Sequence, residues 1–182
     1  MNKYKHIMID IETLGKKDNA VICSVGAVCF NSSDDLTDCL SIVFPVQEQI
    51  EKGRSIDAST LEFWRDNDLR YPSDENKKVT WSLDCLAQFI RNHSIERSEE
   101  DDDGTFIWAH GVTFDITKLQ SLYSDFNLPV PWEYWQIMDC RTMVQLWPEA
   151  REMSLSNNHV ALDDAKNQVH WLKTINTKLG FL

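Results

Sequence analysis

The strand that most constrains the fold lies near the N-terminus, in the stretch HIMIDIETLG at residues 6–15. From Ile7 onward, apolar side chains occupy both of its faces until two acids, Asp10 and Glu12, close it. A strand with two apolar faces is typical of the centre of a sheet that helices cover on both sides. The chain is therefore expected to build an α/β sheet around residues 5–12.

The rest of the chain supplies strands and helices in an order that fits such a sheet. Further strands are predicted at residues 20–30, 39–46, 105–111 and 135–140, with short polar connections that suggest an antiparallel meander of the first three strands. Helices are predicted within residues 55–68, 82–93, 113–127, 141–148 and 161–179. The order β-β-β-α-α-β-α-β-α-α indicates the α/β class, with a mixed sheet covered by helices.

Three of the predicted helices have candidate capping residues at their starts. Ser59 and Glu62 have the spacing of a capping box. Thr113 is a possible N-cap of its helix. Asp139 could be a metal ligand, but Thr142 follows three residues later, and the N-cap interpretation is preferred.

Length and composition limit the class of protein. A chain of 182 residues suits one domain, expected over residues 1–182. The five cysteines are odd in number and form no C-x-x-C pair, so we expect reduced, mostly buried thiols. No signal peptide and no apolar run of about 20 residues is found, which favours the cytoplasm. The net charge of −11 speaks against a nucleic-acid partner, but part of it lies in the run at 96–104, and bound cations could neutralise acids in a site.

The two acids that end the first strand are close together on one face. Alternate residues of a strand share a face, so Asp10 and Glu12 lie roughly 6.5–7 Å apart. Two such carboxylates repel each other and resist burial. Exposure to water, a basic partner or a cation would each relieve this repulsion, and the pair alone does not decide between them.

Two further features carry acids in unusual places. Asp115 lies on the apolar stripe of its predicted helix, although a first-turn acid favoured by the helix dipole is an equal alternative. His159 precedes the last helix, and Asp163 and Asp164 fall in its first turn. Taken alone, His159 would be a surface or capping histidine, and the two aspartates would be dipole-favoured acids.

Together these residues match the needs of phosphodiester hydrolysis with two metal ions. That reaction requires several carboxylates around ions about 3.5–4 Å apart. It also requires a base for the attacking water, and histidine suits proton transfer near neutral pH. Hard cations such as Mg²⁺ prefer carboxylate and water oxygens, which Asp and Glu supply.

The residues resemble the DEDDh group of 3′–5′ exonucleases. The first motif is DIET, from Asp10 to Thr13; the second is HGVTFD, ending at Asp115; the third is HVALDD, from His159 to Asp164. A tyrosine-type motif would have Tyr where Val160 stands. The segment STLEFW at 59–64 also resembles a narrower branch that includes phage exonucleases and a mycobacterial exoribonuclease.

The resemblance implies a ribonuclease-H-like fold: a mixed five-stranded sheet covered by helices on both faces. It also implies that Asp10, Glu12 and Asp164 hold one Mg²⁺ or Mn²⁺ ion, and that Asp10 bridges to a second ion. Asp115 would act on the second ion, directly or through water, and His159 would be the general base. The reaction would be hydrolysis from the 3′ end of DNA or RNA, releasing 5′-mononucleotides.

Substrate contacts are predicted around the first motif. The backbone at Thr13 and Leu14 would meet the terminal nucleotide, and Trp64 is a candidate for stacking on a base. Phe63 is a second candidate for stacking; either ring could instead be a core residue, and for Phe63 the core interpretation is favoured. His110 is a candidate for a phosphate contact, with a buried structural histidine as the favoured alternative.

The partners follow from the same resemblance. A single-stranded or 3′-end nucleic acid is expected, no membrane is expected, and a homodimer is possible through the aromatic residues at 131–135. Arg54 and Lys118 could meet phosphates, with solvated surface positions as the default. The alternative function is a non-catalytic nucleic-acid-binding or subunit-interaction module on the same fold, which would not need all five motif residues.

Overall fold

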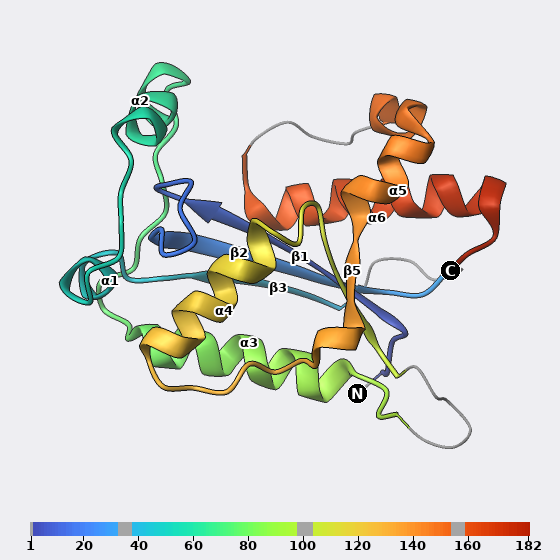
Figure 1. Cartoon of the computed structure of the whole chain (residues 1–182), viewed down its shortest axis with the longest axis horizontal. Helices are drawn as coiled ribbons and strands as arrows, with labels where there is room; N and C mark the ends of the chain where they lie inside the picture. Colours follow the sequence, from blue (N-terminus) through green and yellow to red (C-terminus); the bar gives the residue numbers. More distant parts are fainter. Residues whose placement is uncertain (1, 33–37, 98–103, 154–158) are drawn as a thin grey trace.

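The computed structural model describes residues 2–32, 38–97, 104–153 and 159–182, in which five strands form one sheet (Figure 1). The strands are β1 (His6–Thr13), β2 (Ile22–Phe30), β3 (Cys39–Val43), β4 (Phe106–Ala109) and β5 (Ile137–Asp139). Their spatial order is β3-β2-β1-β4-β5, so β1 is the central strand. The prediction of a mixed five-stranded sheet around the first strand is confirmed.

Strand pairing sets the position of the acidic end of β1. β1 pairs antiparallel with β2 and parallel with β4, and β4 pairs parallel with β5. The register places Asp10 opposite Gly26 of β2. Because β1, β4 and β5 run in the same direction, their carboxyl ends meet at one edge of the sheet, which is the usual place for a site in an open α/β sheet.

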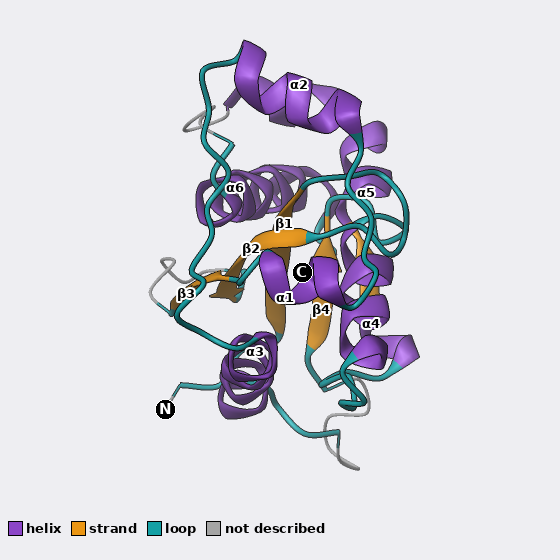
Figure 2. Cartoon of the chain, turned by 90° about the vertical axis from the view of Figure 1, so that its left-hand side faces the viewer, coloured by secondary structure: helices purple, strands orange, loops and turns teal. Residues whose placement is uncertain are grey.

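Helices cover both faces of the sheet, which lies between α6 and α3 in Figure 2. The helices are α1 (Gln47–Glu51), α2 (Ala58–Asp66), α3 (Val79–His93), α4 (Asp115–Asp125), α5 (Cys140–Leu146) and α6 (Ala161–Leu179), with the 3-10 helices η1 (Tyr134–Gln136) and η2 (Pro148–Met153). Ile7 and Ile9 of β1 lie in one core cluster with α3 and α4, and Met8 lies in a second cluster with α5 and α6. No helix in the described ranges is long and apolar enough to cross a membrane.

Two of the three predicted caps are wrong. Ser59 lies inside α2, which follows Asp57, and the Asp57 carboxylate accepts a hydrogen bond from the backbone N–H of Lys16 and does not cap the helix. Phe114 occupies the cap position of α4, so Thr113 is not its cap. Asp139 does cap α5, since its Oδ1 accepts from the backbone N–H of Thr142 at 2.7 Å.

The cysteines behave as predicted from their spacing. All five are free thiols. Cys23, Cys29 and Cys140 are buried, and Cys39 and Cys85 are half-buried. They therefore act as small apolar side chains of the interior.

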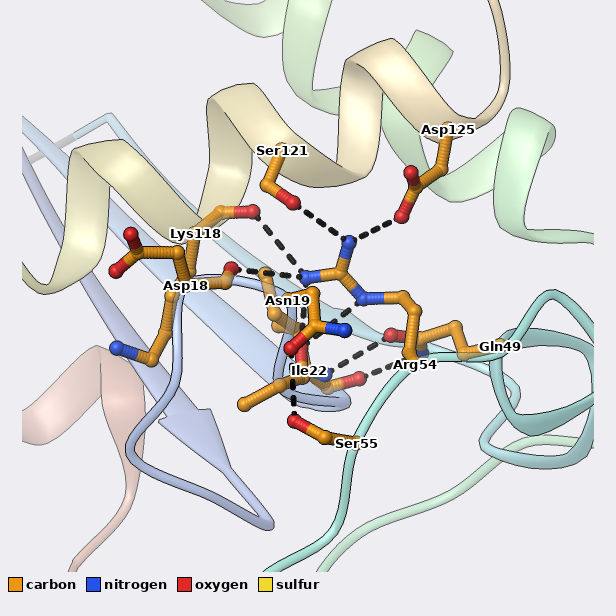
Figure 3. A network of polar contacts seen from close by, with 10 residues as sticks. Asp18, Asn19, Ile22, Gln49, Arg54, Ser55, Lys118, Ser121 and Asp125 are labelled. Carbon is orange, nitrogen blue, oxygen red and sulfur yellow. Dashed lines mark hydrogen bonds and ion pairs between the residues drawn. The ribbon is translucent and has the colours of Figure 1, made fainter.

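The connection between β1 and β2 is tied to α4 by a buried arginine (Figure 3). Arg54 donates to the carbonyl oxygen of Ala20 from Nε at 3.0 Å and from Nη2 at 2.7 Å, and its Nη1 lies 2.6 Å from Asp125. Lys118 is also buried, and its Nζ donates to the carbonyl oxygen of Lys16. Neither cation is a solvated surface residue, and both hold the turn that follows the acidic end of β1.

Candidate active site

The five motif residues come from β1, α4 and the start of α6. Both α4 and α6 contact β1 (Figures 1 and 2). Asp10 and Glu12 lie in the last half of β1, and Asp115 is the first residue of α4. His159 and Asp164 flank the start of α6. We call Asp10, Glu12, Asp115 and Asp164 the carboxylate cluster.

A glycine allows α6 to approach the sheet beside Asp10. A Cβ atom at Gly26 would lie only 2.3 Å from the backbone nitrogen of Leu162 and 2.4 Å from backbone atoms of Ala161. The first turn of α6 therefore rests directly on the backbone of β2. Since Gly26 pairs with Asp10, this contact sets the height of Asp164 above the central strand.

His159 closes the cluster on one side. Single ligand atoms of Glu12, His159 and Asp164 all lie within 4.8 Å of one another. His159 is exposed and has a φ of +50°, a left-handed conformation that is uncommon for residues other than glycine. Its ring packs edge-on against Phe63 of α2, with 5.2 Å between ring centroids. The strained backbone thus turns the imidazole toward the acids and α2.

The environment of the cluster resists negative charge. Burial raises the pKa of Asp10 well above its usual range, and the charge of Asp115 raises it further. Burial, with the charges of Asp164 and Asp115, raises the pKa of Glu12 to about 8. Burial also raises the pKa of Asp115 to about 7 and the pKa of Asp164 above its usual value. Four ionised carboxylates in this place require a compensating positive charge.

Two buried amides of α6 contact the cluster. Gln168 Nε2 donates to Oδ1 of Asp10 at 2.6 Å, and Asn167 hydrogen-bonds Asp164. Oε1 of Gln168 is buried and has no hydrogen-bond partner among the described residues. Sequence reasoning missed both amides, although Gln168 follows Asp164 by four residues and so shares its helix face.

The donor set suits a divalent metal ion. Glu12, His159 and Asp164 are close enough to share one ion, and Asp10 lies among the other acids with one oxygen already bonded to Gln168. Carboxylate oxygens are the ligands that Mg²⁺ and Mn²⁺ prefer. The unpaired Oε1 of Gln168 is a further sign that this site accepts polar groups from outside the chain.

A cavity of about 490 Å³ opens beside Glu12, between the end of β1, the turn at Gly15 and α2. Phe63 and Trp64 both line it, with exposures opposite to those expected. Trp64 is 5% exposed, and its Nε1–H donates to the carbonyl oxygen of Thr13 at 3.2 Å. Phe63 is 42% exposed, so its interpretation as a core residue is wrong, and Phe63 is the ring that is available for stacking.

Thr13 and Leu14 differ in what they can offer to a ligand. Thr13 lines the cavity, but its hydroxyl donates to the carbonyl oxygen of Gly15. Leu14 is buried, its N–H donates to Val21, and its C=O accepts from Asp57. The backbone of Leu14 is thus already used within the protein.

His110 lies on the loop between β4 and α4, next to two arginines. Its Nε2 lies 3.1 Å from Nη2 of Arg151, and its carbonyl oxygen accepts from Arg141. Burial, with the charges of Arg141 and Arg151, lowers the pKa of His110 to about 4. The arginines therefore carry the positive charge at this point, and a neutral His110 supports Arg151.

Comparisons with known proteins give a family match and similarity to solved structures. The family model of the 3′–5′ exoribonuclease Rv2179c-like domain matches residues 5–176. The Mg²⁺- and Mn²⁺-bound form of Pop2p from S. pombe is similar with a TM-score of 0.65 and 12% identity, over 96% of this chain and 84% of that one. The nuclease domain of 3′hExo, a DEDDh family member bound to rAMP, has a TM-score of 0.64 and 13% identity, over 96% and 92% of the two chains. At these identities the two structures establish the ribonuclease-H-like fold alone. No curated protein matches the sequence significantly.

Proposed function

Since the chain belongs to the 3′–5′ exoribonuclease Rv2179c-like domain family and is thus a 3′–5′ exonuclease, we propose that it hydrolyses RNA from the 3′ end and releases 5′-mononucleotides. One observation carries the proposal. Four carboxylates and a histidine from three separate segments converge at one edge of the sheet. A non-catalytic module of the same fold would have no need to bury acids against one another.

The carboxylate cluster would hold two divalent ions, Mg²⁺ or Mn²⁺. Asp10, Glu12 and Asp164 would bind one ion, Asp10 would bridge to the second, and Asp115 would act on the second directly or through water. Two bound ions supply Lewis-acid stabilisation of the attacking and leaving oxygens. They would also relieve the repulsion that burial and mutual charge impose on these acids.

His159 is proposed as the general base. It lies at the rim of the cluster, close to Glu12 and Asp164, and it is exposed to the water that would be the nucleophile. The edge-on contact with Phe63 limits rotation of the imidazole. A proton taken from water by His159 could then pass to solvent, because the ring is accessible.

The cavity beside Glu12 would take the 3′-terminal nucleotide. Glu12 lines the cavity and also belongs to the cluster, so a nucleotide in the cavity would have its phosphate at the acids. The exposed ring of Phe63 would stack on the base. Trp64 would hold the wall of the cavity in place through its hydrogen bond to the carbonyl oxygen of Thr13.

Shortening of a labelled oligonucleotide tests this function. Single-stranded RNA with a 5′ label would be incubated with Mg²⁺ or Mn²⁺, and in parallel with a chelator. We expect a ladder that shortens from the 3′ end only with metal, and an inactive Asp10→Asn variant. A DNA strand of the same sequence should be degraded more slowly if RNA is the substrate. Binding of RNA or DNA without any shortening would instead support the non-catalytic module.

A homodimer through residues 131–135 also belongs to the proposal. Tyr134 is 81% exposed and Trp135 is 44% exposed, while Trp132 is buried in the core. An exposed aromatic pair of this kind is common at protein interfaces. Light scattering after gel filtration should give the mass of two chains, and Trp135→Ser should reduce it to one.

A further inference from the structure

One buried polar side chain of the site has no role in the scheme above. Gln168 lies on α6, one turn after Asp164, and is 3% exposed. Its Nε2 donates to Oδ1 of Asp10 at 2.6 Å. Its Oε1 is buried and has no hydrogen-bond partner among the residues that the structure describes.

Packing does not explain an amide at this position. Apart from Asn167, which hydrogen-bonds Asp164, the other buried positions of α6 are apolar, as at Ala165, Val169 and Leu172. A methionine would fill a similar volume at position 168 without leaving a carbonyl oxygen unpaired, which is unfavourable in the interior. The amide is therefore better explained by what it does for Asp10.

Asp10 is the carboxylate that most needs a fixed orientation. It is surrounded by the charges of Asp115, Glu12 and Asp164, each of which repels it. Without a hydrogen bond to hold it, the carboxylate of Asp10 would rotate away from these neighbours. Gln168 supplies a hydrogen bond from a helix whose position is fixed, because α6 rests on the backbone of β2 at Gly26.

We propose that Gln168 is a positioning residue that holds Oδ1 of Asp10, so that the remaining lone pairs of this carboxylate face the bound ions. The unpaired Oε1 accepts a hydrogen bond from a water molecule that enters with the ions. This inference rests on the proposed metal-dependent function. Groups that orient a metal ligand in this way typically change metal affinity or activity about 10- to 100-fold when they are removed.

The chain contains a matched control for this hydrogen bond. On α3, Gln88 Nε2 donates to Oδ2 of Asp84, also at 2.6 Å. The two residues are exposed and lie on α3, which packs on the face of the sheet opposite to α6. Gln88→Met thus removes the same kind of bond without touching the carboxylate cluster.

The test is a titration of the metal-free full chain with Mn²⁺, followed by electron paramagnetic resonance. Gln168→Met should raise the dissociation constant of Mn²⁺ about 10- to 100-fold relative to wild type. Gln168→Asn keeps an amide but is one methylene too short for Asp10, so it should weaken binding similarly. Gln88→Met should bind as wild type does. The rise in melting temperature on adding Mn²⁺ should shrink in the two Gln168 variants alone.

The outcomes separate this inference from the proposed function. Wild-type protein that binds no Mn²⁺ would overturn both. If wild type binds Mn²⁺ and both Gln168 variants bind it equally well, only the role of Gln168 is refuted. If Gln168→Met does not fold, as judged by circular dichroism of the metal-free protein, the decision rests on Gln168→Asn.

Discussion

Gly26→Ala should disable the candidate site without changing any residue of it. The added Cβ would lie 2.3 Å from the nitrogen of Leu162, whereas Cβ contacts shorter than 3.0 Å essentially do not occur and ordinary contacts begin at 3.4 Å. The start of α6 would therefore have to move away from β2 by about 0.7 to 1.1 Å. The atoms in the way are backbone atoms of Ala161 and Leu162, which cannot rotate aside.

This displacement would carry Asp164 and His159 away from Asp10 and Glu12, since the first pair lies on or beside the first turn of α6. A misplacement of about 1 Å can cost about 100-fold in rate. We expect kcat/KM to fall by roughly that factor and Mn²⁺ affinity to fall with it. Overpacking should also cost about 1–3 kcal/mol of stability.

Initial rates on single-stranded RNA would be measured with saturating Mg²⁺, well below the melting temperature of each variant. Gly180→Ala is the matched control, because Gly180 ends α6 with a φ of +63° and no atom lies within 4 Å of its added Cβ. Placing alanine in this left-handed conformation should lower stability by about 1–2 kcal/mol and leave activity unchanged. If Gly26→Ala kept the kcat/KM and the Mn²⁺ affinity of the wild-type protein, the close approach of α6 would not be what positions the site.

Three further predictions concern single groups of the site. His159→Ala should lower kcat about 10²- to 10⁴-fold while Mn²⁺ binding persists; loss of metal binding in this variant would identify His159 as a ligand and not as the base. With a chelator present, the free energy of unfolding should fall as pH rises from about 4.5 to 8. In the folded protein, Glu12 and Asp115 have pKa values of about 8 and 7, whereas in the unfolded chain they lose their protons at lower pH. Protonation therefore favours the folded state, and this contribution is lost as pH rises. Denaturant titrations at several pH values measure this fall, Glu12→Gln should reduce it, and a rise in stability over the same range would contradict the assigned shifts. Phe63→Ala should raise KM roughly 5- to 150-fold through the loss of about 1–3 kcal/mol of stacking. Leu61→Ala, an equally exposed change on α2, serves as its control in the same kinetic assay.

Local pattern predicted most of the fold. The sequence predicts a helix over residues 161–179, and α6 spans Ala161–Leu179. The two apolar faces of β1 predict a central strand, and β1 lies at the centre of the sheet. The helix α1 has no counterpart in the prediction, because five residues are too few to show a helical period.

Side-chain roles were harder to predict where neighbours in the sequence face opposite ways. Phe63 and Trp64 are adjacent on α2, and their exposures are the reverse of what was expected. The direction of α2 relative to the sheet decides which ring is buried, and no local pattern contains that direction. The same holds for Ser59, whose expected capping role is lost because α2 begins two residues earlier, after Asp57.

The sequence by itself determined that Asp10 and Glu12 share a face, that Asp115 opens a helix, and that His159 and Asp164 flank the start of another. These properties depend on backbone periods of two and 3.6 residues, which any short segment carries. Only the tertiary structure decided that these segments meet, that Gln168 reaches Asp10, and that Gly26 lets α6 approach the sheet. The physical reason is that these contacts join residues far apart in the chain, at distances set by packing of α6 on β2.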